Sequence, residues 1–416
     1  MTATDALSAA ADRYSAFRHP AFLRYWIQRL LNTLAVQIVS VAVGWQIYDL
    51  TRNPFDLGLI GLTQFLPALA LVLFTGAAAD MFGRRMVMGI SQIIELACTL
   101  ALFYLTMRGL NSAAPVFALL TGLGVARAFV GPASSSLIVN LVPQKDFANA
   151  ISWATSCWQI GSITGPVMGG LLYGISPQAA YGTAAALLAI AAAFTFSIHK
   201  PAERPKLGGG ALDNILGGFR YIWSEKIVFG AISLDMFAVL LGGAVALLPV
   251  FARDILAVGP WGLGLLRSAP GVGAILAAIW LSGHPIKDHA GVLMFASVAL
   301  FGAFMALFGV STAAWLSILA LALFGAVDMV SVYVREILIQ LWTPDEVRGR
   351  VNAVNGVFIG ASNELGEFRA GMMASWIGPV GAVVFGGVGA IAVAAIWAWQ
   401  FPALRKMRSL DKGVEL

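Results

Sequence analysis

The feature that most constrains the fold of this 416-residue chain is a series of apolar stretches, each about 20 residues long. The hydrocarbon core of a bilayer is about 30 Å thick and needs roughly 20 apolar residues per helix. Twelve such stretches occur, at residues 25–48, 56–79, 87–107, 115–139, 151–173, 178–198, 227–251, 261–283, 291–310, 315–339, 351–374 and 379–401. The sequence therefore predicts an all-α membrane protein with twelve transmembrane helices.

The amino-acid composition supports a chain embedded in lipid. Hydrophobic residues make up 59% of the sequence and charged residues 11%, whereas soluble domains contain about 45–50% and about 25%. So few charges cannot coat a surface that faces water. The net charge of +5 therefore indicates membrane topology rather than nucleic-acid binding.

The sequence predicts no cofactor and no metal site. Cys98 and Cys157 lie within apolar stretches, where a thiol behaves as a small hydrophobic group. The four histidines lie in tails or short loops without the spacing of metal ligands, and no phosphate-binding glycine-rich loop is present. A membrane-embedded transferase, which would need a convergent set of catalytic groups, is therefore the less favoured alternative, and ATP-driven transport by this chain alone is not expected.

The distribution of Lys and Arg predicts the orientation in the membrane. With both termini in the cytoplasm, eighteen basic residues lie on the inner side, and only Arg52, Arg108 and Arg253 lie on the outer side. This asymmetry follows the positive-inside rule. The basic residues before the first span are not followed by a cleavage pattern, so no cleaved signal peptide is expected.

The chain divides into two similar halves. Residues 199–226 form the longest polar stretch between spans, and the motifs PFDLGL at 54–59 and PWGLGL at 260–265 begin corresponding spans. Such a repeat is typical of transporters with a binding site near the bilayer midplane. We expect pseudo-symmetric six-helix bundles at 25–198 and 227–401, cytoplasmic tails at 1–24 and 402–416, and a linker at 199–226 whose second part is either a spacer or a membrane-surface helix.

The sequence GAAADMFGRR, residues 76–85, follows the second span. It resembles the cytoplasmic loop motif of the major facilitator superfamily, although Met81 stands where that family usually has an arginine. The resemblance implies that Asp80 helps to hold the cytoplasmic side shut, with Gly76, Gly83, Arg84 and Arg85 completing the motif. A pure topology signal is the alternative for the two arginines.

The fifth span contains GSITGPVMGG, residues 161–170. Gly161, Gly165 and Gly169 recur every four residues and allow close helix packing, and Pro166, which removes a backbone hydrogen bond, permits a bend. With Gly170, this stretch resembles the glycine and proline signature of exporters in the superfamily. Tight packing without directional meaning is the other interpretation.

Longer segments, among them WQIYDLTRNPFDLGLIGLTQFLP and TPDEVRGRVNAVN, resemble the siderophore-exporter branch of the superfamily, close to the macrolide efflux pumps. This resemblance implies the major facilitator fold and a monomer in a bacterial inner membrane. It also implies proton-coupled export of a siderophore or an amphipathic drug-like molecule by alternating access. Lysophospholipid or lipid transport is the alternative.

Eleven charged residues lie at membrane depth on these spans. Insertion scales assign roughly 2.5–3.5 kcal/mol to each, so their exposure to lipid would cost on the order of 30 kcal/mol. We therefore expect them to face one another or a cavity. Arg127 and Asp328 lie near the midplane at repeat-equivalent positions and are the leading candidates for cargo binding and proton transfer, with a fixed structural ion pair as the alternative.

Further carboxylates are candidates for proton transfer. Glu364 and Glu367 share one face of the eleventh span, and Asp235 lies one third of the way into the seventh. Glu95 is interpreted as structural. Many drug antiporters of the superfamily carry an acid in the first helix, whereas this chain has none there, and its Asn32 and Gln37 are candidates for hydrogen bonds to cargo or between helices.

Overall fold

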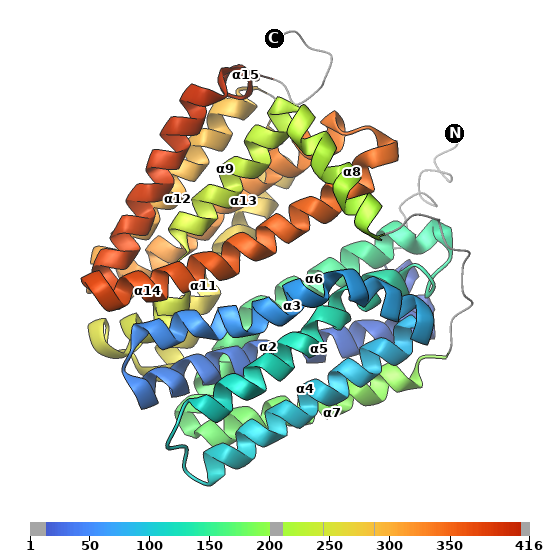
Figure 1. Ribbon diagram of the computed structural model, residues 1–416, viewed down its shortest axis with the longest axis vertical. Coiled ribbons are helices and arrows are strands. Elements are labelled where there is room, and N and C mark those ends of the chain that lie inside the picture. The colour runs from blue at the N-terminus through green and yellow to red at the C-terminus, as the bar shows by residue number, and fades with distance from the viewer. Residues whose placement is uncertain (1–13, 200–210, 244, 287, 409–416) are drawn as a thin grey trace. The chain divides into compact units, whose positions relative to one another are not determined.

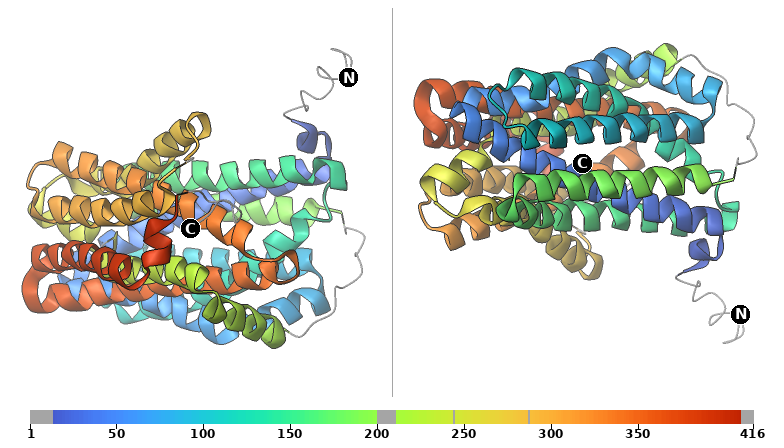
Figure 2. Two further views of the ribbon diagram at one scale, coloured as in Figure 1. Left: turned by 90° about the horizontal axis from the view of Figure 1, so that it is seen from above. Right: turned by 90° about the horizontal axis from the view of Figure 1, so that it is seen from below.

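The computed structural model describes residues 14–199, 211–243, 245–286 and 288–408. Within these ranges the regular elements are all helices (Figures 1 and 2). The longer ones are α2 (Pro20–Thr51), α3 (Pro54–Phe82), α4 (Arg84–Met107), α5 (Ala114–Ile138), α6 (Phe147–Ile175), α7 (Pro177–Ser197), α8 (Ala211–Ser224), α9 (Lys226–Gly242), α11 (Gly259–Gly283), α12 (Ala290–Val310), α13 (Ala314–Trp342) and α14 (Asp345–Gln400). The shorter ones are η1 (Ser15–Arg18), η2 (Gln144–Asp146), η3 (Val245–Leu247), α10 (Leu248–Val250), η4 (Phe251–Ile255) and α15 (Pro402–Lys406).

Ten helical segments of the described chain are long and apolar enough to cross a membrane. Helix α6, which has 29 residues, is not among them. Helix α14 counts as one segment, but its backbone breaks at Gly378, whose φ is 80°, directly before Pro379. This break falls between the two predicted spans at 351–374 and 379–401. The all-helical class is confirmed, and the count of twelve spans stays a prediction.

The predicted seventh span, residues 227–251, is not one continuous helix. Helix α9 ends at Gly242, and the chain continues through η3 and α10 into η4, a single π-helical turn. Arg369 of α14 donates hydrogen bonds to the carbonyls of Leu240, Leu241 and Gly243. Because the last carbonyls of a helix lack partners within it, this guanidinium stabilises the break.

The chain forms two compact units by its internal contacts. Unit 1 comprises the described residues up to Ala42 and from Leu66 to His199, and α4 packs on α5 and α7 there. Unit 2 comprises Val43–Phe65 and the described residues from 211 onwards, where α14 packs on α9 and α12 and α11 packs on α13. The end of α2 and the beginning of α3 therefore belong to the second unit. Each unit has its own buried apolar core.

Helices α11 and α13 of unit 2 touch backbone to backbone at two places. A methyl group added at Gly273 would meet the carbonyl of Ala322, and one added at Gly325 would meet the carbonyl of Pro270. Each helix thus presents a glycine to the backbone of the other. Such small-residue contacts are the usual means of close helix packing in membranes.

The alanine variant of Gly273 tests this contact. We expect Gly273→Ala to destabilise the protein by about 1–3 kcal/mol, because overpacking forces a backbone shift. The matched control is Gly174→Ala in α6, where nothing lies within 4 Å of the added methyl group. Thermal unfolding of both variants in mild detergent measures the difference, and equal melting temperatures would contradict the close contact.

A polar contact joins His19, the residue directly after η1, to η2 in unit 1, outside the predicted spans. The Nε2 atom of His19 lies 3.0 Å from Oδ2 of Asp146, and Asn149 accepts a hydrogen bond from the backbone N–H of Ala16. The hydrogen bond with His19 is the main reason that the pKa of Asp146 is lowered from its ordinary value. The ionised carboxylate is therefore stabilised in the folded state.

The contribution of Asp146 to stability depends on pH with a defined sign. Because the folded-state pKa is lowered, its contribution is fully present above the ordinary aspartate pKa of about 3.9 and is lost as the pH falls through the folded value. Asp146→Asn should therefore lower the melting temperature at about pH 5, and by less below about pH 4. A difference in melting temperature between wild type and Asp146→Asn that grows towards low pH would contradict this assignment.

Candidate functional site

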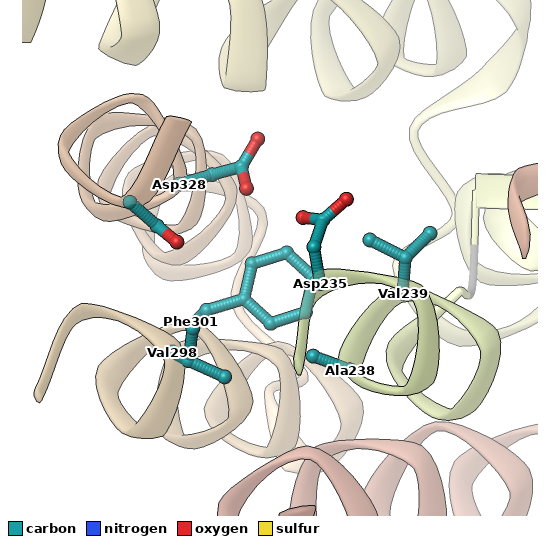
Figure 3. Close-up of a pocket in the computed structure, with 7 residues that line it drawn as sticks. Asp235, Ala238, Val239, Val298, Phe301 and Asp328 are labelled. Atoms are coloured by element: carbon teal, nitrogen blue, oxygen red, sulfur yellow. The ribbon is translucent and has the colours of Figure 1, made fainter. Parts of the chain in front are cut away.

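A small cavity in unit 2 is lined by two acidic residues. Asp235 and Ala238 of α9, Phe301 of α12, and Asp328 and Ser331 of α13 are among its lining residues. Figure 3 shows the two carboxylates at this cavity, with the Phe301 ring below them in this view. The cavity volume is about 10 Å³, which is roughly enough for one water molecule.

An ion pair lies beside this cavity. Arg335 of α13, whose exposed fraction is 3%, binds Asp235, which is 8% exposed, through Nη1 and Oδ1. Arg335 is seven residues, or about two helical turns, from Asp328. Asp328 interacts electrostatically with both Asp235 and Arg335. The structure thus brings Asp235, Asp328 and Arg335 together, with two acids sharing one arginine. A proton on one acid would balance the charge of this group.

A second acidic group in unit 2 lies between α3, α11 and α14. Glu364 and Glu367 of α14 interact with each other, and Arg267 of α11 interacts with Glu367. The side chain of Glu364 occupies the space beside Gly61 of α3, where an added methyl group would overlap its Oε2 atom. The two predicted glutamates therefore lie together, again as two acids with one arginine.

The predicted residues of unit 1 lie in a different arrangement. Arg127 of α5 has its Nε atom 3.9 Å from Oε1 of Glu95 in α4. Asp328, its predicted repeat-equivalent partner, belongs to unit 2. Within unit 1 the acid beside Arg127 is thus Glu95. A separate buried chain of hydrogen bonds runs from Thr195 through Gln92 to Gln28 and links α7, α4 and α2.

The glycine stripe of α6 packs against α2. Methyl groups added at Gly161, Gly165 and Gly169 would meet Thr33, Gln37 and Ile38. Gln37 thus lies against the stripe, and Oδ1 of Asn32, on the same helix α2, accepts no hydrogen bond from a described residue. Pro166 and Gly170 are buried in α6.

The loop motif is described in part. Gly83 has a φ of 82° and separates α3 from α4, a backbone conformation that glycine adopts without strain. Arg85 donates a hydrogen bond to the carbonyl of Ile198, and Arg84 begins α4. The backbones of Gly76 and Asp80 lie in α3, while their side-chain surroundings lie outside what the structure describes.

A charged cluster in unit 2 was not anticipated from the sequence. Arg52 lies 3.3 Å from Asp254 and 3.9 Å from Asp49, and Asp49 also binds Arg253. The hydroxyl of Tyr48 donates a hydrogen bond to Asp254. We call these five residues the outer cluster, because the positive-inside assignment puts Arg52 and Arg253 on the outer side. The signal available in the sequence was an acid and an arginine close together in each of the segments YDLTR and ARDI.

Comparisons with known proteins identify the family. A family described as transmembrane secretion effector matches residues 11–414. The enterobactin exporter EntS of Escherichia coli O1:K1 / APEC is 25% identical over 407 residues and covers 95% of each chain. EntS of Shigella boydii serotype 18 matches with the same identity and coverage. These relatives are exporters by name.

Solved structures of transporters share the fold. A bacterial homologue of the human lysosomal transporter Spinster, in an inward-facing and unoccupied conformation, superimposes with a TM-score of 0.71 and 14% identity, covering 94% of this chain and 96% of its own. A variant of the nucleoside transporter NupG superimposes with a TM-score of 0.71 and 14% identity, covering 92% and 99%. At these identities the likeness shows the fold alone.

The family match spans nearly the whole chain, and ten apolar helices are long enough to cross a bilayer. The acid and arginine groups described above lie on those helices, where charges are costly unless they are functional or paired. The chain therefore belongs to the transmembrane secretion effector family of the major facilitator superfamily, and it is an integral membrane transporter rather than an enzyme.

Proposed function

We propose that this protein is a proton-coupled exporter in a bacterial inner membrane, with both termini in the cytoplasm. The observation that carries the proposal is the group of Asp235, Asp328 and Arg335 beside a water-sized cavity on apolar helices. Two acids with one arginine at membrane depth bind one proton to reach neutrality, and they release it when their surroundings change. The exporter relatives support the direction of transport.

The mechanism we propose is alternating access between two six-helix bundles, at residues 25–198 and 227–401, joined by the linker 199–226. A proton entering from outside neutralises the acids and permits one conformation, and its release inside permits the other. The group of Glu364, Glu367 and Arg267 is a second site for this exchange. Arg127 attracts an anionic group of the cargo, and Asn32 and Gln37 offer hydrogen bonds to it.

The outer cluster has a mechanical role in this proposal. It joins the end of α2 to η4 through ion pairs whose partners are partly exposed, with exposed side-chain fractions of 54% for Arg52 and 39% for Asp254. Exposed pairs of this kind contribute about 0–1 kcal/mol each. Contacts of this strength can hold an outer entrance closed and can still break at the rate of a transport cycle. Asp80 of the loop motif helps to close the cytoplasmic side.

The cargo that we propose is a siderophore of the catecholate type or an amphipathic drug-like molecule, as the exporter relatives suggest. The purified full-length protein, reconstituted in proteoliposomes with an imposed pH gradient, tests this with enterobactin and with a labelled lysophospholipid. We expect gradient-driven movement of enterobactin, abolished by a protonophore. Movement of the lysolipid without enterobactin would replace the proposal with lipid transport.

A further inference from the structure

Glu95 is a buried acid that the proposed transport mechanism does not use. It lies in α4 with an exposed fraction of 1%. Neither of its carboxyl oxygens accepts a hydrogen bond within the part of the chain that the structure describes. An ionised carboxylate in such a place loses the stabilisation of water and gains no hydrogen bond in return. The neutral, protonated acid is the form that suits this environment.

The polar groups nearest along α4 differ from Glu95 in this respect. Gln92, one turn earlier on the same helix, donates a hydrogen bond of 2.7 Å to Gln28 and accepts one of 2.6 Å from Thr195. These buried side chains therefore satisfy one another. The lack of hydrogen bonds at Glu95 is a property of that residue rather than of the whole helix interface.

Arg127 is the charged group that faces Glu95. The separation of 3.9 Å between Nε and Oε1 is too long for a hydrogen bond, whereas a settled pair of a guanidinium and a carboxylate has N···O distances of about 2.7–2.9 Å. The side chain of Arg127 is 29% exposed and that of Glu95 is 1% exposed. Arg127 thus reaches from the buried acid towards accessible space.

Among the residues that the structure describes, Arg127 and the thiol of Cys98 interact electrostatically with Glu95. Cys98 lies on α4 itself. Helix α7 packs on the same helix and carries Tyr181, which is fully buried and interacts with Tyr173. The positive charge that can stabilise an ionised Glu95 is therefore that of Arg127 on α5.

We propose that Glu95 is a proton-binding site of unit 1 and that Arg127 is the positioning residue that pairs with its carboxylate after the proton has left. In the conformation described here the carboxyl group holds its proton. When its O–H bond breaks, the proton passes to water on the exposed side of Arg127, and the resulting carboxylate forms a direct ion pair with the guanidinium. Protonation reverses these steps.

Protonation of Glu95 changes how strongly the positive charge of Arg127 can attract cargo. With Glu95 protonated, the positive charge of Arg127 is not neutralised by it and attracts an anionic group, whereas an ionised Glu95 competes with that group. Protonation of Glu95 and binding of an anion at Arg127 therefore favour each other. That the anion is a group of the cargo rests on the proposed export function, whereas the protonation of Glu95 does not.

Infrared difference spectroscopy tests the protonation directly. The full-length protein in lipid nanodiscs, labelled with ¹³C-glutamate, is titrated from low to high pH while the C=O band of protonated glutamate is followed. We expect wild type to lose a component of this band that is missing from Glu95→Gln. Glu346→Gln, which removes an exposed glutamate of α14, should leave that component in place. Spectra of wild type and Glu95→Gln that superimpose would overturn the proposal.

Two further variants separate a proton site from a structural role. In Glu95→Asp the component should reappear at the frequency of the unlabelled carboxyl group, which also decides the matter where Glu95→Gln does not fold. In Arg127→Gln the component should persist to higher pH, because the cation that stabilises the ionised form is gone. An unshifted titration in Arg127→Gln, or no unlabelled component in Glu95→Asp, would overturn the proposal. None of these measurements requires cargo, so their failure is distinct from failure of export.

Discussion

Replacement of Asp328 by asparagine, or of Glu364 by glutamine, is expected to abolish proton-driven transport in inverted membrane vesicles. Each variant replaces a carboxyl group, which binds and releases a proton, with an amide group. The amide has nearly the same size and can still form hydrogen bonds. Asp328 lies at the cavity with Asp235, and Glu364 lies with Glu367 and Arg267. Because the amide cannot be ionised, the gradient no longer drives the cycle.

The measurement is uptake of enterobactin into inverted vesicles with an acidic interior, compared with vesicles that lack the transporter. Immunoblotting confirms that equal amounts of each variant are in the membrane. Asp345→Asn is the matched control, because this carboxylate on α14 has an exposed side-chain fraction of 82%, and it should transport like wild type. Unchanged uptake in both Asp328→Asn and Glu364→Gln would refute the assignment of these acids to proton coupling.

Loss of the buried arginine beside the cavity is the second large effect that we expect. Arg335→Met leaves Asp235 buried without its partner, and breaking a buried ion pair in this way costs about 3–5 kcal/mol. The double variant Asp235→Leu with Arg335→Met removes both charges and should recover most of that stability, since apolar replacements of buried pairs are often neutral.

Chemical or thermal unfolding in mild detergent measures both variants. The control is Arg405→Met, which removes an exposed arginine of α15 and should change stability by no more than about 0.5 kcal/mol. A double variant that is less stable than Arg335→Met would show that the pair does not act as a unit. The stable double variant is also informative, because transport by it would exclude Asp235 from proton transfer.

The helical class was readable from the sequence because the length and apolarity of each segment are local properties. The predicted span 291–310 and helix α12 differ by one residue at one end. Helix α2 extends several residues beyond its predicted span at both ends, because helices continue into the aqueous regions where hydropathy falls. The end of α9 at Gly242 was missed, since it depends on Arg369, more than a hundred residues away.

The sequence predicted which charged residues lie at the candidate site, but not which of them form ion pairs. A charge at membrane depth is visible in the sequence because it is costly there, and Asp235, Asp328, Glu364 and Glu367 were found in this way. Which arginine faces which acid depends on how helices rotate against their neighbours. The pairing of Arg335 with Asp235, and of Arg127 with Glu95, therefore had to come from the structure.

The reciprocal glycine contacts of α11 and α13 have a consequence for measurements of motion. Two helices that touch through backbone atoms at two levels cannot slide or rotate against each other without a clash. Spin labels at Ile279 of α11 and Leu341 of α13, both exposed, should thus keep one distance throughout a transport cycle. This helix pair provides an internal ruler within unit 2, against which the displacement of any other helix can be calibrated.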